Sequence, residues 1–364
     1  MQHTPLYQAH VDLGARMVDF GGWSMPISYG SQISEHHTVR RGAGVFDVSH
    51  MTILDFKGTE VGSFLRRVLA NDVSKLQSEG QALYSCMLRE DGGILDDLIV
   101  YWFGGERFRI ISNAATCTKD LAWFREVASG TAVEIDQRKD LAMLAVQGPR
   151  AREIVAKSIL HSKKCLALGP FFSTQIGNYM LARTGYTGED GFEVILPAKN
   201  VCGFWEALLK HGVVPCGLGS RDTLRLEAGL NLYGADMDES VSPLRCGLKW
   251  TVALGEERDF IGRQALYHEL KAGLKDKQVG LILNGKGVLR TGYSVRTVFG
   301  SGTLTSGSYS PTLGCSIAFA RVPVQSERAC EVEIRGRWHD ARIVKPPFVR
   351  HGKIEVDMLQ GETA

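Results

Sequence analysis

Two adjacent aspartates, Asp96 and Asp97, are the residues whose setting most strongly indicates chemistry. Side chains in a strand alternate between two faces, so Leu95, Asp97, Ile99 and Tyr101 are expected on one face and Ile94, Asp96, Leu98 and Val100 on the other. Both faces are otherwise apolar, which is typical of a buried strand, and a buried carboxylate is costly without a partner. We therefore expect at least one aspartate to meet a specific donor or a ligand. The structural alternative, more open for Asp96 than for Asp97, is that they cap a turn or pair with an arginine in the core.

A second acid, Glu193, begins an otherwise apolar run at the end of the glycine-rich segment Arg183–Val194. No Lys-Ser or Lys-Thr pair follows the glycines, and Phe192–Leu196 reads as a strand, so a phosphate-binding loop is excluded by context. The segment is predicted to be a loop between two strands. A hairpin with a tight turn would explain the glycines, but it would not explain the acid.

Two further segments carry arginines. Gly217–Gly229 has the spacing of a helix whose first turn offers free N–H groups and whose Arg221 and Arg225 lie on one side. Taken alone, an exposed helix with ion pairs is the favoured interpretation. Near the end of the chain, Arg350 follows a rigid Pro-Pro stretch, where its guanidinium would either clamp a carboxylate or lie on the surface.

The spacing of His50 and of the cysteines does not favour a catalytic triad, a zinc site or disulfide bonds. Asp47, Ser49 and His50 are too close in sequence to line up as nucleophile, base and orienting group, so a structural histidine is expected. The 8 cysteines include no C-x-x-C pair and no zinc spacing, and they are expected to be reduced thiols. No metal site is predicted.

The composition indicates an ordinary folded protein. With 42 basic and 40 acidic residues the net charge is +2, which gives no general attraction for a nucleic-acid backbone. No window approaches a membrane span, and Met1–Leu6 shows neither a signal peptide nor a transit peptide. We expect a cytoplasmic protein, or alternatively one of the mitochondrial matrix after processing.

The pattern of elements predicts an α+β fold with several domains. Helices are expected at Glu60–Leu69, Thr118–Ala128 and Phe204–Lys210, and a strand pair at Ile94–Phe103 and Phe108–Ser112. After about residue 278, short β-like runs broken by Gly, Ser and Pro predict a small β-barrel. At 364 residues the chain should hold two or three domains, with a ligand in the cleft between them.

These segments, with others in the same order, resemble the T protein family of the glycine cleavage system over nearly the whole chain. The further matching stretches are Thr4–Tyr7, Gly14–Trp23, Phe46–Met51, Leu232–Glu239 and Thr305–Gly314. The resemblance implies a three-domain cloverleaf around a central folate-binding hole, with a C-terminal β-barrel. It places the central domain at 1–50 plus 140–248, a second α+β domain at 51–139 and the barrel at 278–364, with 249–277 connecting.

The same resemblance implies an activity and roles for matching positions. The expected activity is an aminomethyltransferase that moves the methylene carbon from the lipoylated H protein to tetrahydrofolate, giving 5,10-methylenetetrahydrofolate and ammonia. Asp97 would be the catalytic carboxylate near folate N10, and Glu193 would accept hydrogen bonds from the pterin. Arg221 and Arg350 match arginines that bind substrate. Positions lining the folate pocket match Met51, Tyr84, Ile111, Asn113 and Tyr186.

Two alternative proteins share the same fold, and a third alternative belongs to another class. A protein of iron–sulfur cluster maintenance would carry a Lys-Gly-Cys-Tyr-x-Gly-Gln-Glu signature, whereas Asp259–Gln264 lacks the cysteine. The folate domain of a sarcosine or dimethylglycine dehydrogenase is expected to follow a flavin-binding domain, which this sequence lacks. A folate-binding scaffold without turnover would share the pocket, and an activity assay distinguishes it.

Overall fold

The structure is a computed structural model that describes residues 1–255 and 258–357. Positions 256–257 of the predicted connecting segment, and 358–364 at the end of the predicted barrel domain, lie outside the described residues. Within the described part, no helix combines the length and the apolar character needed to cross a membrane.

The amino-terminal part and the middle of the chain together build one six-stranded sheet. Its strands, in spatial order, are β11 (Ser173–Ile176), β12 (Tyr179–Ala182), β13 (Gly191–Pro197), β10 (Leu141–Gln147), β4 (Gly44–Asp47) and β14 (Val214–Pro215). Helices α1 (Tyr7–Asp12), α2 (Gln32–Arg41), α5 (Ala151–Ser158) and α6 (Val201–Lys210) accompany it. Beside it, β1 (Gln2–His3), β3 (Trp23–Ser28) and β2 (Arg16–Phe20) form a small sheet. Strand β4 therefore joins strands that come a hundred residues later in the sequence.

A five-stranded sheet follows in the chain and carries the two aspartates. Its spatial order is β6 (Ala82–Leu88), β7 (Ile94–Trp102), β8 (Arg107–Ser112), β5 (Thr52–Lys57) and β9 (Glu134–Gln137). Helices α3 (Val61–Val68) and α4 (Cys117–Val127) pack on one face, where Phe56, Phe64 and Phe124 meet in the core. The predicted strand pair and both predicted helices are confirmed here, with ends that differ by one residue.

The carboxyl-terminal part closes into a barrel. Its strands, in spatial order, are β15 (Asp276–Leu283), β18 (Cys315–Pro323), β17 (Gly300–Ser310), β16 (Ser294–Thr297), β19 (Ala329–Ile334) and β20 (Arg337–Val344). A two-stranded ribbon, β21 (Val349–Arg350) and β22 (Lys353–Ile354), follows it, and α8 (Arg263–Ala272) precedes it. The predicted α+β fold with a C-terminal β-barrel is confirmed.

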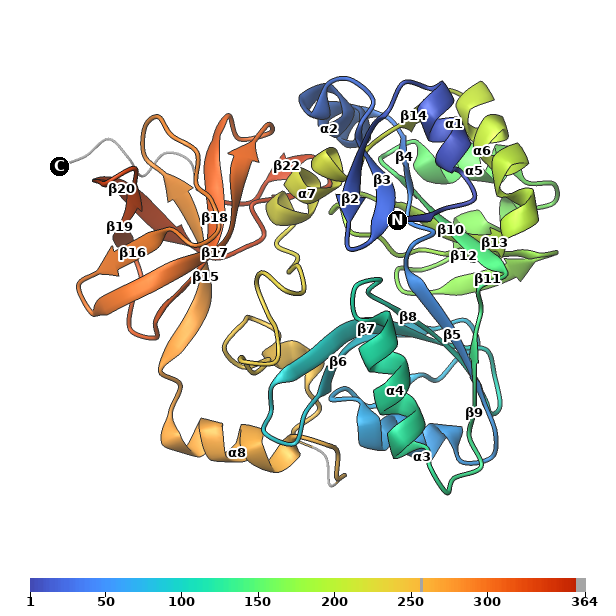
Figure 1. Cartoon of the computed structure of the whole chain (residues 1–364), viewed down its shortest axis with the longest axis horizontal. Coiled ribbons are helices and arrows are strands. Elements are labelled where there is room, and N and C mark those ends of the chain that lie inside the picture. The colour runs from blue at the N-terminus through green and yellow to red at the C-terminus, as the bar shows by residue number, and fades with distance from the viewer. Residues whose placement is uncertain (256–257, 358–364) are drawn as a thin grey trace.

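Figure 1 shows the barrel, the six-stranded sheet and the five-stranded sheet as three groups around the middle of the molecule. The long segment after α7 (Leu218–Glu227) runs between the barrel and the edge strand β6 before it reaches α8. The predicted domain boundaries stay a prediction.

Helix α7 ties the groups together through buried charges. Glu227 at its carboxyl end accepts from Arg40 Nη2 of α2 at 2.7 Å and from Ser310 Oγ of the barrel at 2.5 Å. Arg225 Nη1 donates to Asp236 Oδ2 at 2.7 Å. The expectation of an exposed ion-pair helix is therefore wrong, because α7 is packed between α2 and β3 on one side and the barrel strands β17 and β18 on the other. Arg225 also pairs with Asp222 within the helix at 2.9 Å, but Glu227 and Asp236 join it to other segments.

Candidate active site

Strand β7 places the two aspartates on opposite faces of the five-stranded sheet. Ile99 and Tyr101, on the Asp97 face, pack toward the six-stranded sheet, whereas Leu98 packs beneath α3 and α4. Leu95 departs from the predicted alternation, because it packs with Leu98. The cause is a register shift: Met87 pairs with Asp96 and Leu88 with Ile94, so Leu95 is the extra residue of a bulge.

Asp97 is half-buried and held by two neutral donors. Tyr84 Oη donates to Asp97 Oδ2 at 2.8 Å, and Asn113 Nδ2 donates to Asp97 Oδ1 at 2.9 Å. Burial and the charge of neighbouring Asp96 raise the pKa of Asp97 to about 7, and the two hydrogen bonds oppose that rise. A carboxyl group titrating near neutrality can take or give a proton during a reaction.

Asp96 is fully buried and makes three hydrogen bonds as an acceptor. Asn113 donates to it from its backbone N at 3.2 Å and from Nδ2 at 2.8 Å, and Thr116 Oγ1 donates at 2.8 Å. The predicted donors for a buried aspartate therefore exist. The alternative of a core arginine partner is wrong, because neutral groups supply every one of these bonds. Asn113 Nδ2 spans both carboxylates, and this fixes its orientation.

The neighbour of Asp97 on the other side is an aromatic pair. Tyr84 stacks on Trp250 with ring centroids 5.7 Å apart, and Trp250 is 67% exposed. A large exposed aromatic beside a partly buried tyrosine offers a flat apolar surface to a ring-shaped ligand. Sequence analysis missed Trp250, which lies in a short 3₁₀ helix, Lys249–Thr251, without any pattern of its own.

Glu193 is the acid of the six-stranded sheet, and it is only 6% exposed. Thr184 Oγ1 donates to its Oε2 at 2.5 Å, and Tyr101 Oη lies 3.0 Å from the same Thr184 oxygen. Because the Thr184 proton goes to Glu193, Tyr101 is the donor to Thr184. Burial raises the pKa of Glu193, while the Arg221 charge and the Thr184 bond lower it. Within residues 1–255 and 258–357, Oε1 receives no hydrogen bond, so it is open to a ligand's donor.

Arg221 of α7 stands near Glu193 without touching a carboxylate. Its guanidinium lies over the ring of Tyr186 at 4.9 Å and over Phe46 at 5.9 Å. Its Nη1 is buried and has no hydrogen-bond partner in the described part of the chain. Burial lowers the pKa of Arg221, and Glu193 and Tyr186 oppose this. An orphaned guanidinium donor is costly, which indicates a place for a ligand acceptor.

The loop that carries Tyr186 is pressed against α7, and its glycines allow this. Gly188 has φ +75°, and a Cβ there would lie 2.8 Å from Ala228 Cβ. A Cβ on Gly185 would lie 2.0 Å from Gln147 Oε1. The prediction of a loop between two strands is confirmed, and the glycines serve close packing as well as turning. Tyr186 Oη donates to the Asn231 carbonyl.

Met51 and Ile111 contribute apolar surface between the strand that carries Asp97 and the strand that carries Glu193. Both belong to the cluster between the two sheets, and Ile111 pairs with Ile99 across β7 and β8. Arg350 is exposed in β21, and the residue after it, His351, donates its backbone N–H to the Gly188 carbonyl at 2.9 Å. Tyr84 and Asn113 therefore contact Asp97 directly. Arg350 is linked to the glycine-rich loop through its neighbour His351.

Tyr186 lies near both Asp97 and Arg221. The charges of Asp97 and Arg221 both act on its phenol, and burial, the largest cause, raises its pKa. The five-stranded sheet, the glycine loop and α7 therefore face one region. His50 lies beside it but is buried and neutral, because burial lowers its pKa to about 4. Asp47 pairs with His10 at 3.0 Å instead, which is consistent with the predicted structural role of His50.

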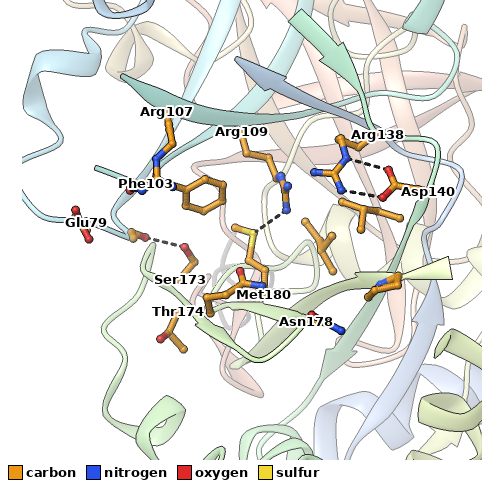
Figure 2. Close-up of a pocket in the computed structure, with 15 residues that line it drawn as sticks. Glu79, Phe103, Arg107, Arg109, Arg138, Asp140, Ser173, Thr174, Asn178 and Met180 are labelled. Carbon is orange, nitrogen blue, oxygen red and sulfur yellow. Dashed lines mark hydrogen bonds and ion pairs between the residues drawn. The ribbon is translucent and has the colours of Figure 1, made fainter. Parts of the chain in front are cut away.

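Figure 2 shows a different cavity, of about 610 Å³, between the same two sheets. Arg109 of β8 points across it toward Met180, and Arg138 pairs with Asp140 at its edge. No predicted site residue lines it. Asn113 directly follows β8 and lies about four residues, or ~13 Å, from Arg109, so this cavity is separate from the region that faces Asp97.

Comparison with known proteins agrees with this geometry. Residues 6–256 match the GCVT N-terminal domain model, and residues 277–350 match the glycine cleavage T-protein C-terminal barrel domain. An aminomethyltransferase of Stenotrophomonas maltophilia (strain K279a) is 54% identical over 98% of this chain and 99% of its own length. One of Xylella fastidiosa (strain M23) is 52% identical over 99% of this chain and 100% of its own.

The crystal structure of glycine cleavage system aminomethyltransferase T from Bartonella henselae superposes with a TM-score of 0.91 at 33% identity, covering 97% of this chain and 99% of that one. Sequence, domain models and three-dimensional structure agree over nearly the full length of the chain. The chain therefore belongs to the glycine cleavage T-protein family.

Proposed function

We propose that this aminomethyltransferase passes the methylene carbon of an aminomethyl group, held on a dihydrolipoyl sulfur of the H protein, to tetrahydrofolate. The products are 5,10-methylenetetrahydrofolate, ammonia and the dihydrolipoyl thiol. Folate N5 attacks the methylene carbon as ammonia leaves, and N10 then closes the ring as the thiol leaves. The protons on N5 and N10 balance those gained by the two leaving groups.

The observation that carries the proposal is Asp97, a half-buried carboxyl group held between Tyr84 and Asn113. Its pKa near 7 suits a group that accepts the N10 proton as the ring closes. The two neutral donors fix its orientation, so it needs no rearrangement when charge develops. We assign Asp97 the role of orienting folate and managing the proton at N10.

The open groups of the site fit the rest of a reduced folate. A pterin presents a ring N–H and an amino group on one edge, which suit a carboxylate, and Glu193 Oε1 is open to such donors. Arg221 Nη1, which has no hydrogen-bond partner among the described residues, would donate to an acceptor of the ligand. Tyr84, Trp250, Tyr186, Met51 and Ile111 provide flat or apolar surface for the rings. We give Arg350 a role in substrate binding as well.

The remaining assignments also belong to this proposal. The lipoylated H protein is the donor partner, and neither nucleic acid nor a membrane is a partner, which the net charge of +2 supports. We place the protein in the cytoplasm, as expected from the bacterial relatives, with the mitochondrial matrix as the alternative. The proposed reaction uses no metal ion.

Reconstituted glycine cleavage tests the proposal. Wild-type protein, the glycine dehydrogenase subunit, lipoylated H protein and tetrahydrofolate should yield methylenetetrahydrofolate. Asp97→Asn should bind folate normally but turn over about a hundredfold more slowly, the size of a lost general base. The exposed Asp136→Asn is the matched control. Absence of product with wild-type protein would identify a folate-binding scaffold, and full turnover by Asp97→Asn would remove its catalytic role.

A further inference from the structure

A third carboxyl group, Asp120, lies behind the two aspartates of β7. It is in the first turn of α4 and is 0% exposed. Thr116 places it near Asp96: Thr116 Oγ1 donates to Asp96 Oδ2 at 2.8 Å, and Asp120, one helical turn later, donates its backbone N–H to the Thr116 carbonyl at 2.9 Å. The family resemblance assigns no role to Asp120. It lies in the predicted helix Thr118–Ala128, and the sequence does not indicate which residues it faces.

The hydrogen bonds around the pair are unequal. Asp96 accepts three, two from Asn113 and one from Thr116. Neither oxygen of Asp120 accepts a bond of good geometry in the described part of the chain. Thr116 Oγ1 lies closer to Asp96 Oδ2, at 2.8 Å, than to the Asn113 carbonyl, at 3.1 Å, and within the described residues Ser112 Oγ makes no hydrogen bond of good geometry. A buried carboxylate without donors is strongly disfavoured, whereas a protonated one can donate to its neighbour.

Among the described residues, no cation is placed to neutralise the Asp96 and Asp120 carboxylates. Among the residues that the structure describes, no group of three or more His, Cys, Asp or Glu is arranged to hold a metal ion. The ammonium of the preceding residue, Lys119, donates to Tyr233 Oη at 2.8 Å and to Glu239 Oε1 at 2.7 Å. The amino end of α4 favours a negative charge by only about 0.3–1 kcal/mol, which is less than the cost of burying an unpaired carboxylate.

We propose that Asp120 is a positioning residue that carries a proton and donates it to Asp96, so that the single charge of the pair stays on Asp96. That charge holds the Asn113 amide, whose Nδ2 then donates to Asp97 at 2.9 Å. Asp120 thus acts on Asp97 through Asp96 and Asn113 without touching substrate. The inference builds on the proposed role of Asp97.

The electrostatics of the neighbourhood are consistent with this assignment. Burial and the Asp96 charge raise the pKa of Asp120 to about 9, and the Thr116 and Ser112 hydroxyls oppose this. The other titratable or charged groups around the three aspartates are Tyr84, Cys86, Lys119, Tyr186, Tyr233, Glu239 and Cys246. Burial raises the pKa of Tyr84 and of Cys86, so both are neutral when Asp120 titrates.

Infrared difference spectroscopy of the folate-free protein tests the proton directly. At pH 8, where Asp97 is mostly ionised, the wild type should show the carbonyl stretch of a buried carboxylic acid that shifts in D₂O. The band should persist in Asp97→Asn and disappear in Asp120→Asn. A wild type without the band, or a band that survives Asp120→Asn, overturns the proposal. Because neither folate nor H protein is present, this result is independent of the proposed function.

Turnover tests the positioning role. Asp120→Ala should lose about tenfold in kcat with folate KM unchanged, because Asp96 loses one donor. Asp120→Asn, whose amide can still donate, should recover most of that loss and should lack the decline in rate that the wild type shows as Asp120 ionises near pH 9. An Asn variant as slow as the Ala variant, with the alkaline decline retained, indicates a purely structural role. Asp136→Asn, on an exposed side chain, is the control for both assays.

Discussion

Removing the Tyr84 hydroxyl should move the acid limb of the pH profile to higher pH. Tyr84 donates to Asp97 at 2.8 Å, and this bond lowers the Asp97 pKa against burial and Asp96. A hydrogen bond to a charged group is worth ~1.5–3 kcal/mol, and one pKa unit corresponds to ~1.4 kcal/mol. Because Asp97 is only half-buried, we take the lower end and expect Tyr84→Phe to raise its pKa by about one unit.

The consequence for activity depends on pH. At pH 7 the ionised fraction of Asp97 falls from about one half to about one tenth, so kcat/KM should fall roughly fivefold. Near pH 9 both proteins are almost fully ionised at Asp97, and the difference should nearly vanish. The measurement is kcat/KM for tetrahydrofolate across this range in the reconstituted assay.

The control is Tyr179→Phe, which removes a hydroxyl on β12 that lies outside the proposed site. Its profile should match that of the wild type. A Tyr84→Phe profile that is lowered equally at every pH, with no shift of the acid limb, would refute the reasoning, because it would show that the hydroxyl does not set the Asp97 pKa.

Two further substitutions test the contact of Glu193 with the pterin and the buried ion pairs of Glu227, which connect α2 and α7 to the barrel. Glu193→Gln should weaken tetrahydrofolate binding about tenfold by calorimetry, because a charged acceptor for the pterin edge becomes neutral; an unchanged Kd would contradict this. Burial alone would raise the pKa of Glu227, but His36 and Arg40 lower it from 4.5 to about 2. The folded-state pKa is therefore depressed, and the ion contributes ~3 kcal/mol above pH 4.5 that is lost as the pH falls toward 2. Glu227→Gln should lower Tm at pH 7 and approach the wild type near pH 2, and a Tm gap that stays constant with pH would exclude this charge effect.

The elements that hold the acids were predictable because their signals are local. Glycine pairs flank Ile94–Trp102 on both sides, and its alternation of side chains gave the correct faces from Asp97 onward. Leu95 was misplaced because a bulge depends on how β6 pairs with β7, which one strand's pattern does not contain.

Other features depend on what packs against an element. The helical spacing of α7 was clear, but the same pattern fits an exposed helix as well as one packed between a sheet and a barrel. Asp120 and Trp250 gave no signal for the same reason, since contacts distant in sequence define their roles. Asp97 and Glu193, by contrast, were visible as acids in apolar strands.

The most direct test is a crystal structure of the protein with tetrahydrofolate. The pterin edge should meet the Glu193 carboxylate, and folate N10 should lie within hydrogen-bond reach of Asp97. Folate bound in the cavity beside Arg109 (Figure 2), or with its pterin turned away from both acids, would contradict it.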